Sequence, residues 1–338
     1  MKLEVCIVGL GRAGRFHLNS VKQLDKFRLK YVVEPNLSMA KEVLGDIDST
    51  VTDDIDKALS DPSLDAVIVS SPTQFHYEHV RKSLEAGKNV FSEKPLGKTL
   101  EEIQTCFDLA HSKGLALHLG FQRRCDKNFN DLKESIKHIG QIRTIKTSSR
   151  DNPQPSFEYL KTSGNIFHDM LIHDFDMLIY LLGYKIPESV FAFGHAYDND
   201  IASIPDFDTV LVTIKYPDGL ICSIDTSRIS VYGYDQRIEL FGDLGMAIAE
   251  NQRDSTVNLY TSAGTIQRPI NYSFPQRYRE SYYKEIEGFA NEIDNKILYN
   301  VSRKECILGH VIANAAHESA TTNTVVDFSK FKPLLIEN

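Results

Sequence analysis

The strongest constraint on the fold is a glycine pattern that directly follows an apolar segment at the start of the chain. The apolar segment covers residues 3–8, and Gly9, Gly11 and Gly14 follow it in the order Gly-x-Gly-x-x-Gly. Between a strand and a helix, Gly9 permits a tight turn, Gly11 lets a pyrophosphate approach the backbone, and Gly14 lets the helix pack closely on the strand. The N–H groups at the start of such a helix bind phosphates. The pattern therefore predicts a dinucleotide site, with a plain glycine turn as the alternative.

An acidic residue indicates which dinucleotide binds. Glu34 follows a second apolar segment, residues 29–33, and lies 20 residues beyond Gly14. A carboxylate there accepts hydrogen bonds from the adenosine ribose hydroxyls and repels a 2′-phosphate, so it favours NAD over NADP. Lys30 and Arg12 are nearby cations that can soften this exclusion. The motif alone leaves nicotinamide and flavin dinucleotides both open.

The rest of the chain predicts two domains. At roughly 100 to 200 residues per domain, a chain of 338 residues forms two domains or one large one. Residues 1–122 alternate short β-branched segments with helical periods, which predicts an α/β Rossmann domain with a parallel sheet. Residues 123–338 contain one apolar helix at 165–182 and long alternating segments, with a hairpin turn at 217–219. We expect this half to be an α+β domain for substrate binding and oligomerisation, with a large mixed or antiparallel sheet.

Three side chains are candidates for catalysis. Lys94 follows the apolar segment 89–91, which places it at the carboxyl end of a parallel strand, where open α/β sheets bind ligands. The alternative is an ordinary surface lysine. Asp169 and His173 are four residues apart in the helix 165–182, so they share a face and can form a general base with an orienting carboxylate. Alternatively, Asp169 serves only the helix dipole and His173 is a satisfied, partly buried histidine.

Composition and charge exclude several partners. The chain has 38 Lys and Arg against 46 Asp and Glu, a formal net charge of −8, so nothing attracts the whole protein to nucleic acid or an anionic membrane. No signal peptide and no membrane-spanning segment is expected. The five cysteines include no CxxC pair, which fits a reducing, cytoplasmic location. His168 lies about 100° around a helix from Asp169, and we expect no metal site.

Five motifs occur in one order along most of the chain. They are Gly9-x-Gly11-x-x-Gly14-x-x-His17, Ser71-Pro72-Thr73-x-x-His76, Glu93-Lys94-Pro95, Gly120-Phe121-Gln122-Arg123-Arg124 and Asp169-x-x-x-His173. Together they resemble the glucose-fructose oxidoreductase/inositol dehydrogenase/rhizopine catabolism (Gfo/Idh/MocA) family, and within it the inositol 2-dehydrogenase branch.

The resemblance implies roles for individual residues. Lys94 hydrogen-bonds the reacting hydroxyl, His173 takes its proton, and Asp169 fixes the tautomer of His173 and helps to bind substrate. Contacts to the cofactor NAD are implied for Gly9, Gly11, Arg12, Ala13, Gly14, Glu34, Ser71, Pro72, Thr73, His76, Glu93, Lys94 and Gln122.

The resemblance also implies a substrate pocket, with one departure from the family pattern. Arg123, Asn152 and Tyr282 correspond to residues that lie along the polyol. Inositol dehydrogenases of this kind often carry His-Arg-Asn-Pro, whereas this chain has Arg150-Asp-Asn-Pro. A fixed cation at Arg150 keeps several substrates open: an inositol isomer, another cyclic polyol, a sugar, or a sugar acid whose carboxylate pairs with Arg150.

The expected function is an NAD-dependent dehydrogenase that oxidises a secondary hydroxyl of a cyclic polyol or sugar, with inositol as the leading substrate. The alternatives are a related sugar or sugar-acid dehydrogenase or reductase, a glycosidase that keeps NAD bound, and a non-catalytic sensor that binds the dinucleotide as a signal. Because an alternating sheet leaves one face uncovered, we also expect a homodimer or homotetramer formed through the C-terminal sheet.

Overall fold

The computed structural model describes residues 2–295 and 301–337. The chain divides into two compact units: Met1–Cys125 with Glu280–Ile307, and Asp126–Arg279 with Leu308–Asn338. The second unit thus differs from the expected continuous domain at 123–338, because residues 280–307 return to the first unit. Within the described residues, no helix is both long and apolar enough to cross a membrane.

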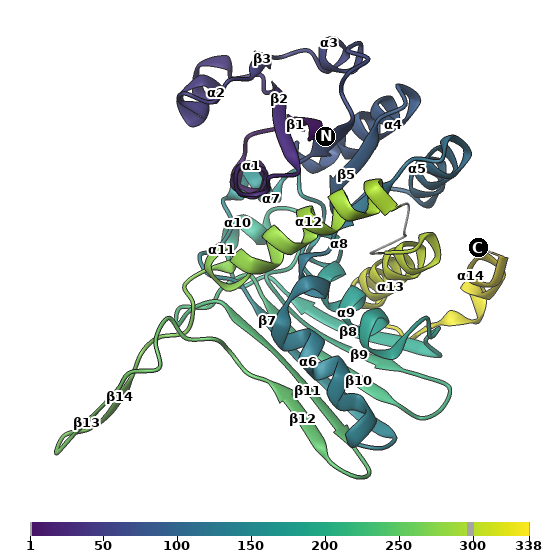
Figure 1. Ribbon diagram of the computed structural model, residues 1–338. Coiled ribbons are helices and arrows are strands. Elements are labelled where there is room, and N and C mark those ends of the chain that lie inside the picture. Colours follow the sequence, from purple (N-terminus) through teal and green to yellow (C-terminus); the bar gives the residue numbers. More distant parts are fainter. Residues whose placement is uncertain (1, 296–300, 338) are drawn as a thin grey trace. The chain divides into compact units, whose positions relative to one another are not determined.

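The first unit is built on a six-stranded sheet in which all neighbouring strands are parallel (Figure 1). The strand order is β3-β2-β1-β4-β5-β6, the order of a dinucleotide-binding Rossmann fold. The strands are β1 (Leu3–Val8), β2 (Phe27–Val33), β3 (Thr50–Thr52), β4 (Ala66–Val69), β5 (Asn89–Glu93) and β6 (Leu117–Gly120). The expected α/β fold of this half is confirmed.

The helices of the first unit follow the local signals of the sequence. For example, Thr99 accepts a hydrogen bond from the Glu102 N–H at 3.2 Å, and Gly114 ends the same helix with a φ of 63°. The helices are α1 (Arg12–Gln23), α2 (Leu37–Leu44), α3 (Ile55–Leu59), α4 (His76–Glu85), α5 (Leu100–Lys113) and α12 (Arg279–Asn295), with 3-10 turns η1 (Thr73–Phe75) and η2 (Gln122–Cys125).

Helix α12 belongs to the first unit because its apolar face completes the core there. Ile286, Phe289 and Ala290 are fully buried and pack in one cluster with strand residues such as Val5 and Phe91. Burial of a large apolar side chain contributes about 1.5 to 3 kcal/mol. The helical period predicted for this segment is correct, but the apolar pattern carries no sign of which sheet the helix covers.

Strand register brings the ligand-binding loops of the first unit to one edge. Val8 pairs with both Val33 and Val69, and Glu93 pairs with Gly120. The residues after β1, β2, β4 and β5 therefore leave the sheet at the same edge, where Rossmann folds bind dinucleotides.

The second unit contains a seven-stranded mixed sheet, as expected for this half. Its order is β12-β11-β7-β10-β9-β8-β15, and only β7 and β10 are parallel among the described pairs. The strands are β7 (Ile142–Arg150), β8 (Ser189–His195), β9 (Thr209–Lys215), β10 (Ile221–Ser227), β11 (Asp235–Gly242), β12 (Met246–Ala249) and β15 (Val326–Asp327). A separate hairpin, β13 (Asn258–Thr261) and β14 (Gly264–Gln267), projects away from the sheet (Figure 1).

Helices cover one face of this sheet (Figure 1). Ser149 on β7 donates a hydrogen bond to Asp174 on α9 at 2.9 Å, and Ser319 on α13 accepts one from the Ala192 N–H on β8 at 2.9 Å. The helices of the second unit are α6 (Lys127–Ser135), α7 (Phe157–Leu160), α8 (Ile166–Asp169), α9 (Ile172–Leu182), α10 (Asn199–Ala202), α11 (Phe274–Arg277), α13 (Arg303–Thr322), which begins in the first unit, and α14 (Lys332–Glu337), with turns η3 (Ile136–His138) and η4 (Phe328–Phe331).

The apolar segment 165–182 is two helices instead of the one that was expected. The Leu171 N–H donates to the Ile166 carbonyl oxygen at 2.9 Å, a bond that spans five residues where an α-helix spans four. This wider turn separates α8 from α9. Asp169 therefore ends α8 and His173 lies in the first turn of α9, so the two residues are not four apart on one continuous helix.

Candidate active site

The glycine loop between β1 and α1 is tightly packed at two of its three motif glycines. A Cβ atom on Gly14 would lie 2.0 Å from the Gly9 carbonyl oxygen, and one on Gly9 would lie 2.7 Å from the Ser70 carbonyl oxygen. Packing within the protein therefore explains both glycines. Gly11 is different, because a Cβ there would meet nothing within 4 Å. No packing contact of the described residues therefore requires a glycine at position 11, which fits a dinucleotide that approaches the backbone at this point.

Two alanine substitutions separate these roles. Gly14→Ala should cost about 3 kcal/mol of unfolding free energy because its methyl group collides with the backbone. Gly11→Ala should leave stability nearly unchanged and weaken NAD binding at least about tenfold. Denaturant unfolding and calorimetric titration with NAD measure the two effects. A Gly11→Ala protein with wild-type affinity for NAD would contradict the placement of the pyrophosphate.

Glu34 is held beside the glycine loop at the end of β2. Its carboxylate oxygens accept hydrogen bonds from the backbone N–H groups of Leu10, at 2.9 Å, and Asn36, at 3.1 Å. This position fits recognition of a ribose and exclusion of a 2′-phosphate. Lys30, a cation that was expected to soften this exclusion, pairs instead with Asp61 at 2.6 Å, and that contact raises the pKa of Lys30.

His76 links the loops that follow β4 and β5. Its Nδ1 lies 2.9 Å from the Pro95 carbonyl oxygen and its Nε2 lies 2.8 Å from that of Ser71. Burial lowers the pKa of the ring, and a neutral ring donates to only one of the two carbonyls. Both ring nitrogens therefore face the protein backbone, so His76 supports the expected cofactor residues Ser71, Pro72 and Thr73 through its backbone contacts.

Lys94 follows β5 directly, at the same sheet edge as the glycine loop. It is partly exposed, and its bond to Pro95 is cis. The preceding Glu93 carboxylate lies 2.7 Å from the Nε2 atom of His17. Gln122 and Arg123, which follow β6 in η2, are both buried.

In the second unit, the buried Asp169 carboxylate belongs to a polar network. It accepts hydrogen bonds from the Tyr159 hydroxyl at 2.7 Å and from Arg228 at 3.0 Å. Arg228 is fully buried and also donates to Asp206 at 2.9 Å. His173 lies in the first turn of α9 and is partly exposed. These hydrogen bonds hold the Asp169 carboxylate in one orientation.

Sequence reasoning missed Arg228, Tyr159 and Asp206. The sequence contains one weak indication for Arg228. It continues the alternation in which every second residue, Cys222, Ile224 and Thr226, faces the core. A charged residue on the core side of a strand needs a buried partner. Nothing in the sequence identifies that partner as Asp169, which is 59 residues away.

Three residues that were expected to bind substrate make contacts within the protein. Arg150 donates hydrogen bonds to Asp225 and to the Tyr232 hydroxyl, and Asp225 raises its pKa. Asn152 donates to the Tyr272 carbonyl oxygen at 2.9 Å. The ring of Tyr282, in the first unit, packs on Phe16 and His17 and is 8% exposed.

Comparison with known proteins decides the family. Residues 3–121 match an oxidoreductase family with an NAD-binding Rossmann fold, and residues 129–248 match the GFO/IDH/MocA C-terminal domain. The chain belongs to the Gfo/Idh/MocA family. The resemblance seen in the five motifs is thereby confirmed, and the protein is an oxidoreductase that uses NAD.

Several relatives match along most of their length. The myo-inositol 2-dehydrogenase of Thermotoga maritima is 36% identical over 323 residues, which cover 94% of this chain and 96% of that protein. The scyllo-inositol 2-dehydrogenase (NAD⁺) of Bacillus subtilis is 33% identical over 299 residues, 87% of each chain. The Lactobacillus casei scyllo-inositol dehydrogenase, solved with NAD(H) and scyllo-inositol, matches with a TM-score of 0.90 and 26% identity over 97% of this chain and 100% of that chain.

Proposed function

We propose that this Gfo/Idh/MocA member oxidises a secondary CH–OH group of a cyclic polyol, as an inositol 2-dehydrogenase. The observation that carries the proposal is the position of Lys94, which leaves the sheet at the same edge as a glycine loop that fits NAD. The names of the relatives supply the substrate class.

The glycine loop and Glu34 would hold NAD, which would supply the acceptor for the hydride from the carbon that carries the hydroxyl. The Lys94 ammonium group donates a hydrogen bond to the hydroxyl oxygen and stabilises the negative charge that develops on it. His173 accepts the hydroxyl proton as general base, which typically contributes about 10² to 10⁴ in rate.

Asp169 orients His173 and stabilises the imidazolium that forms. An ionised carboxylate has about four acceptor positions, so Asp169 can accept a hydrogen bond from His173 as well as those from Tyr159 and Arg228. Because Tyr159 and Arg228 hold Asp169 in place, it needs no reorganisation when the proton is transferred.

A neutral polyol suits this chain better than a sugar acid. Arg150 was the residue that kept a carboxylate substrate open, but Asp225 and Tyr232 already bind its guanidinium. A carboxylate ligand would have to displace Asp225. We therefore propose Arg123 and Asn152, which carry over from the family motifs, as the groups that position the hydroxyls of an uncharged ring.

Spectrophotometry of NADH formation with a panel of substrates tests this function. The panel contains myo-inositol, scyllo-inositol, glucose and gluconate, and a glycoside is followed for release of its leaving group. We expect NADH with at least one inositol and little with gluconate. NADH only with gluconate, or glycoside cleavage without net NADH, would contradict the proposal.

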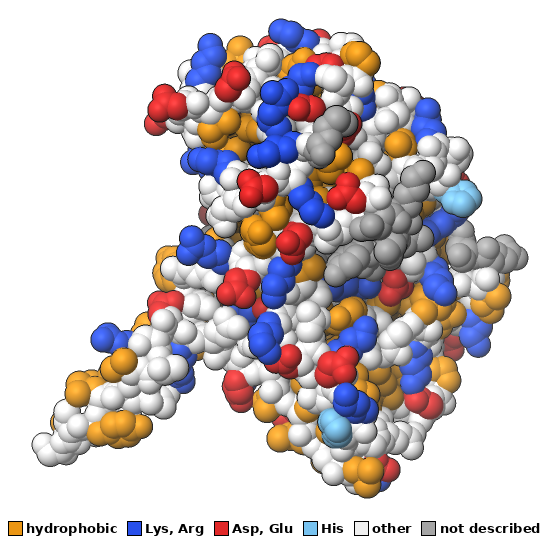
Figure 2. Space-filling view, in the orientation of Figure 1, with side chains coloured by type: hydrophobic (Ala, Val, Ile, Leu, Met, Phe, Trp, Pro, Cys, Tyr) orange, Lys and Arg blue, Asp and Glu red, His pale blue; other side chains and the backbone are white. Residues whose placement is uncertain are grey.

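We also propose that the protein is a cytoplasmic homo-oligomer. The uncovered face of the seven-stranded sheet exposes apolar side chains, among them Phe193, Leu211 and Phe241. More apolar side chains lie along the β13–β14 hairpin (Figure 2). A patch of this kind in a globular protein marks an interaction surface. Sedimentation velocity should give a mass at least twice 38.3 kDa, and a monomer at micromolar concentration would contradict this.

The cysteines are consistent with a reducing location. None of the five forms a disulfide, and burial raises the pKa of Cys106 and of Cys222 to about 12. Such thiols are inert packing groups and not redox centres.

A further inference from the structure

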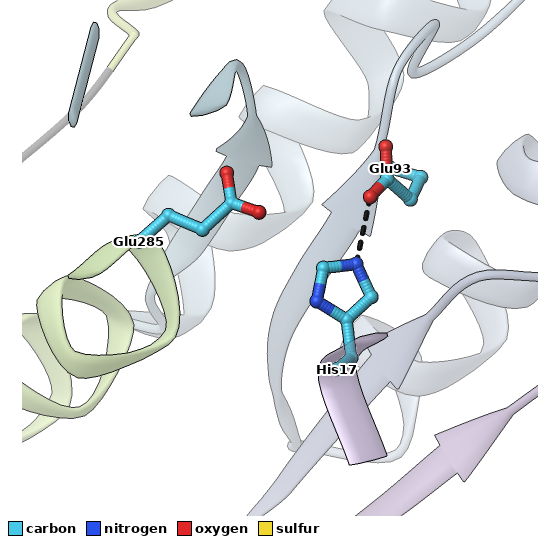
Figure 3. A group of neighbouring side chains, drawn as sticks. All are labelled: His17, Glu93 and Glu285. Atoms are coloured by element: carbon cyan, nitrogen blue, oxygen red, sulfur yellow. Dashed lines mark hydrogen bonds and ion pairs between the residues drawn. The ribbon is translucent and has the colours of Figure 1, made fainter. Parts of the chain in front are cut away.

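Three ionisable side chains meet in the interior of the first unit. His17 comes from α1, Glu93 from the end of β5 and Glu285 from α12, and Figure 3 shows the three polar ends turned toward one another. One polar atom from each lies within 4.8 Å of the others. His17 and Glu285 have no exposed surface, and the Glu93 side chain is 13% exposed.

The cluster is only partly satisfied by hydrogen bonds. His17 Nε2 lies 2.7 Å from a Glu93 carboxylate oxygen. Both carboxylate oxygens of Glu285, and His17 Nδ1, are buried without a hydrogen-bond partner among the described residues. The rings of Phe91 and Tyr282 pack against His17, and the other Glu93 oxygen lies against Gly120.

Two buried carboxylates this close cannot both be ionised without a large cost, because each removes the other's solvation and repels its charge. Burial raises the pKa of the Glu93 carboxyl, but its hydrogen bond with His17 and its neighbours His17, Lys94 and His76 together lower it by more, so the net shift is downward. For Glu285, burial and then the Glu93 charge raise its pKa well above the ordinary value.

A metal ion is the other way to neutralise such a cluster, since one histidine and two carboxylates form a donor set for zinc. The distance between His17 and Glu93 is too short for two ligands of one zinc ion. Two ligands on one tetrahedral zinc lie about 3.3 Å apart, whereas His17 and Glu93 are in direct hydrogen-bond contact at 2.7 Å.

We infer that Glu285 is a neutral carboxylic acid, and that Glu285 and His17 together position the end of β5 and hence Lys94. Glu285 is thus a positioning residue that acts through Glu93 and touches neither substrate nor cofactor. The part of this inference that concerns turnover rests on the proposed function. The protonation state of Glu285 does not.

Two measurements on the protein without substrate test the protonation state. The infrared difference spectrum of wild type minus Glu285→Gln should contain the C=O stretch of a protonated carboxylic acid. Because Glu285 is ionised in the unfolded chain and must take up a proton on folding, the wild type should lose stability relative to Glu285→Gln as pH rises above the ordinary glutamate range. At acidic pH the two proteins should be equally stable.

Turnover tests the positioning role. Glu285→Ala should lower kcat by about tenfold to a hundredfold with NAD affinity little changed, because a small displacement of Lys94 is costly. Glu285→Gln keeps the shape and the neutral charge, so kcat should stay within about threefold of wild type. Glu292→Gln is the matched control. Glu292 is a buried carboxylate of α12 as well, but it pairs with His118 and not with the His17–Glu93 pair.

The outcomes are distinct. Absence of the carboxylic acid band, a Glu285→Gln protein that is less stable than wild type at alkaline pH, or stoichiometric zinc that Glu285→Gln releases would each overturn the protonated state. Wild-type kcat in Glu285→Ala would overturn the positioning role. If no polyol is oxidised by the wild type, the proposed function fails while the infrared and stability results still decide the state of Glu285.

Discussion

Replacement of Lys94 by alanine should abolish polyol oxidation and leave NAD binding nearly unchanged. The ammonium group is proposed to contact the oxygen that becomes negative during hydride transfer, so its loss removes an interaction that is strongest in the transition state. The expected fall in kcat is about 10² to 10⁴. Stopped-flow or steady-state NADH formation measures it, together with calorimetric titration of NAD.

Lys98→Ala provides the matched control. Lys98 is an exposed lysine four residues further along the same loop, and its removal should change neither kcat nor NAD affinity. Full activity in Lys94→Ala would show that Lys94 is an ordinary surface lysine, the alternative that its sequence position also allowed.

Replacement of Arg228 by leucine should cause the largest loss of stability. Arg228 is fully buried and binds two carboxylates, Asp169 at 3.0 Å and Asp206 at 2.9 Å. Without the guanidinium, two buried negative charges lose their common partner, which costs about 3 to 5 kcal/mol. Equilibrium unfolding in urea measures the change.

An exposed ion pair in the second unit serves as the control for the effect of burial on stability. Lys215 pairs with Glu188 at 2.7 Å, and both side chains are about half exposed. Lys215→Leu should therefore change stability by less than about 1 kcal/mol. Equal effects for Arg228→Leu and Lys215→Leu would contradict the buried network.

Local signals in the sequence predicted much of the fold. The glycine pattern at residues 9–14, the capping threonine at position 99 and the turn at 217–219 each depend on neighbours within a few residues, and each forms the expected element. Features that depend on contacts between distant parts of the chain could not be predicted from local signals. Nothing within α12 shows that its apolar face completes the core of the first unit, and the five-residue turn that separates α8 from α9 leaves the apolar pattern unchanged.

The same distinction applies to the candidate site. The ends of predicted parallel strands were sufficient to place Glu34 and Lys94 at one sheet edge. By contrast, Asp225 lies 75 residues from Arg150 in sequence and Asp169 lies 59 residues from Arg228, and only the fold brings these pairs together. Arg150 therefore appeared free to bind a substrate carboxylate, although Asp225 binds it.

Transfer of deuterium tests the central claim most directly. The protein is incubated with NAD and myo-inositol, or scyllo-inositol, that carries deuterium on every ring carbon, and the products are examined by mass spectrometry and NMR. The account predicts one deuterium at C4 of the nicotinamide ring of NADH and a ketone that has lost one deuterium. NADH without deuterium, or no NADH from either inositol, would contradict it.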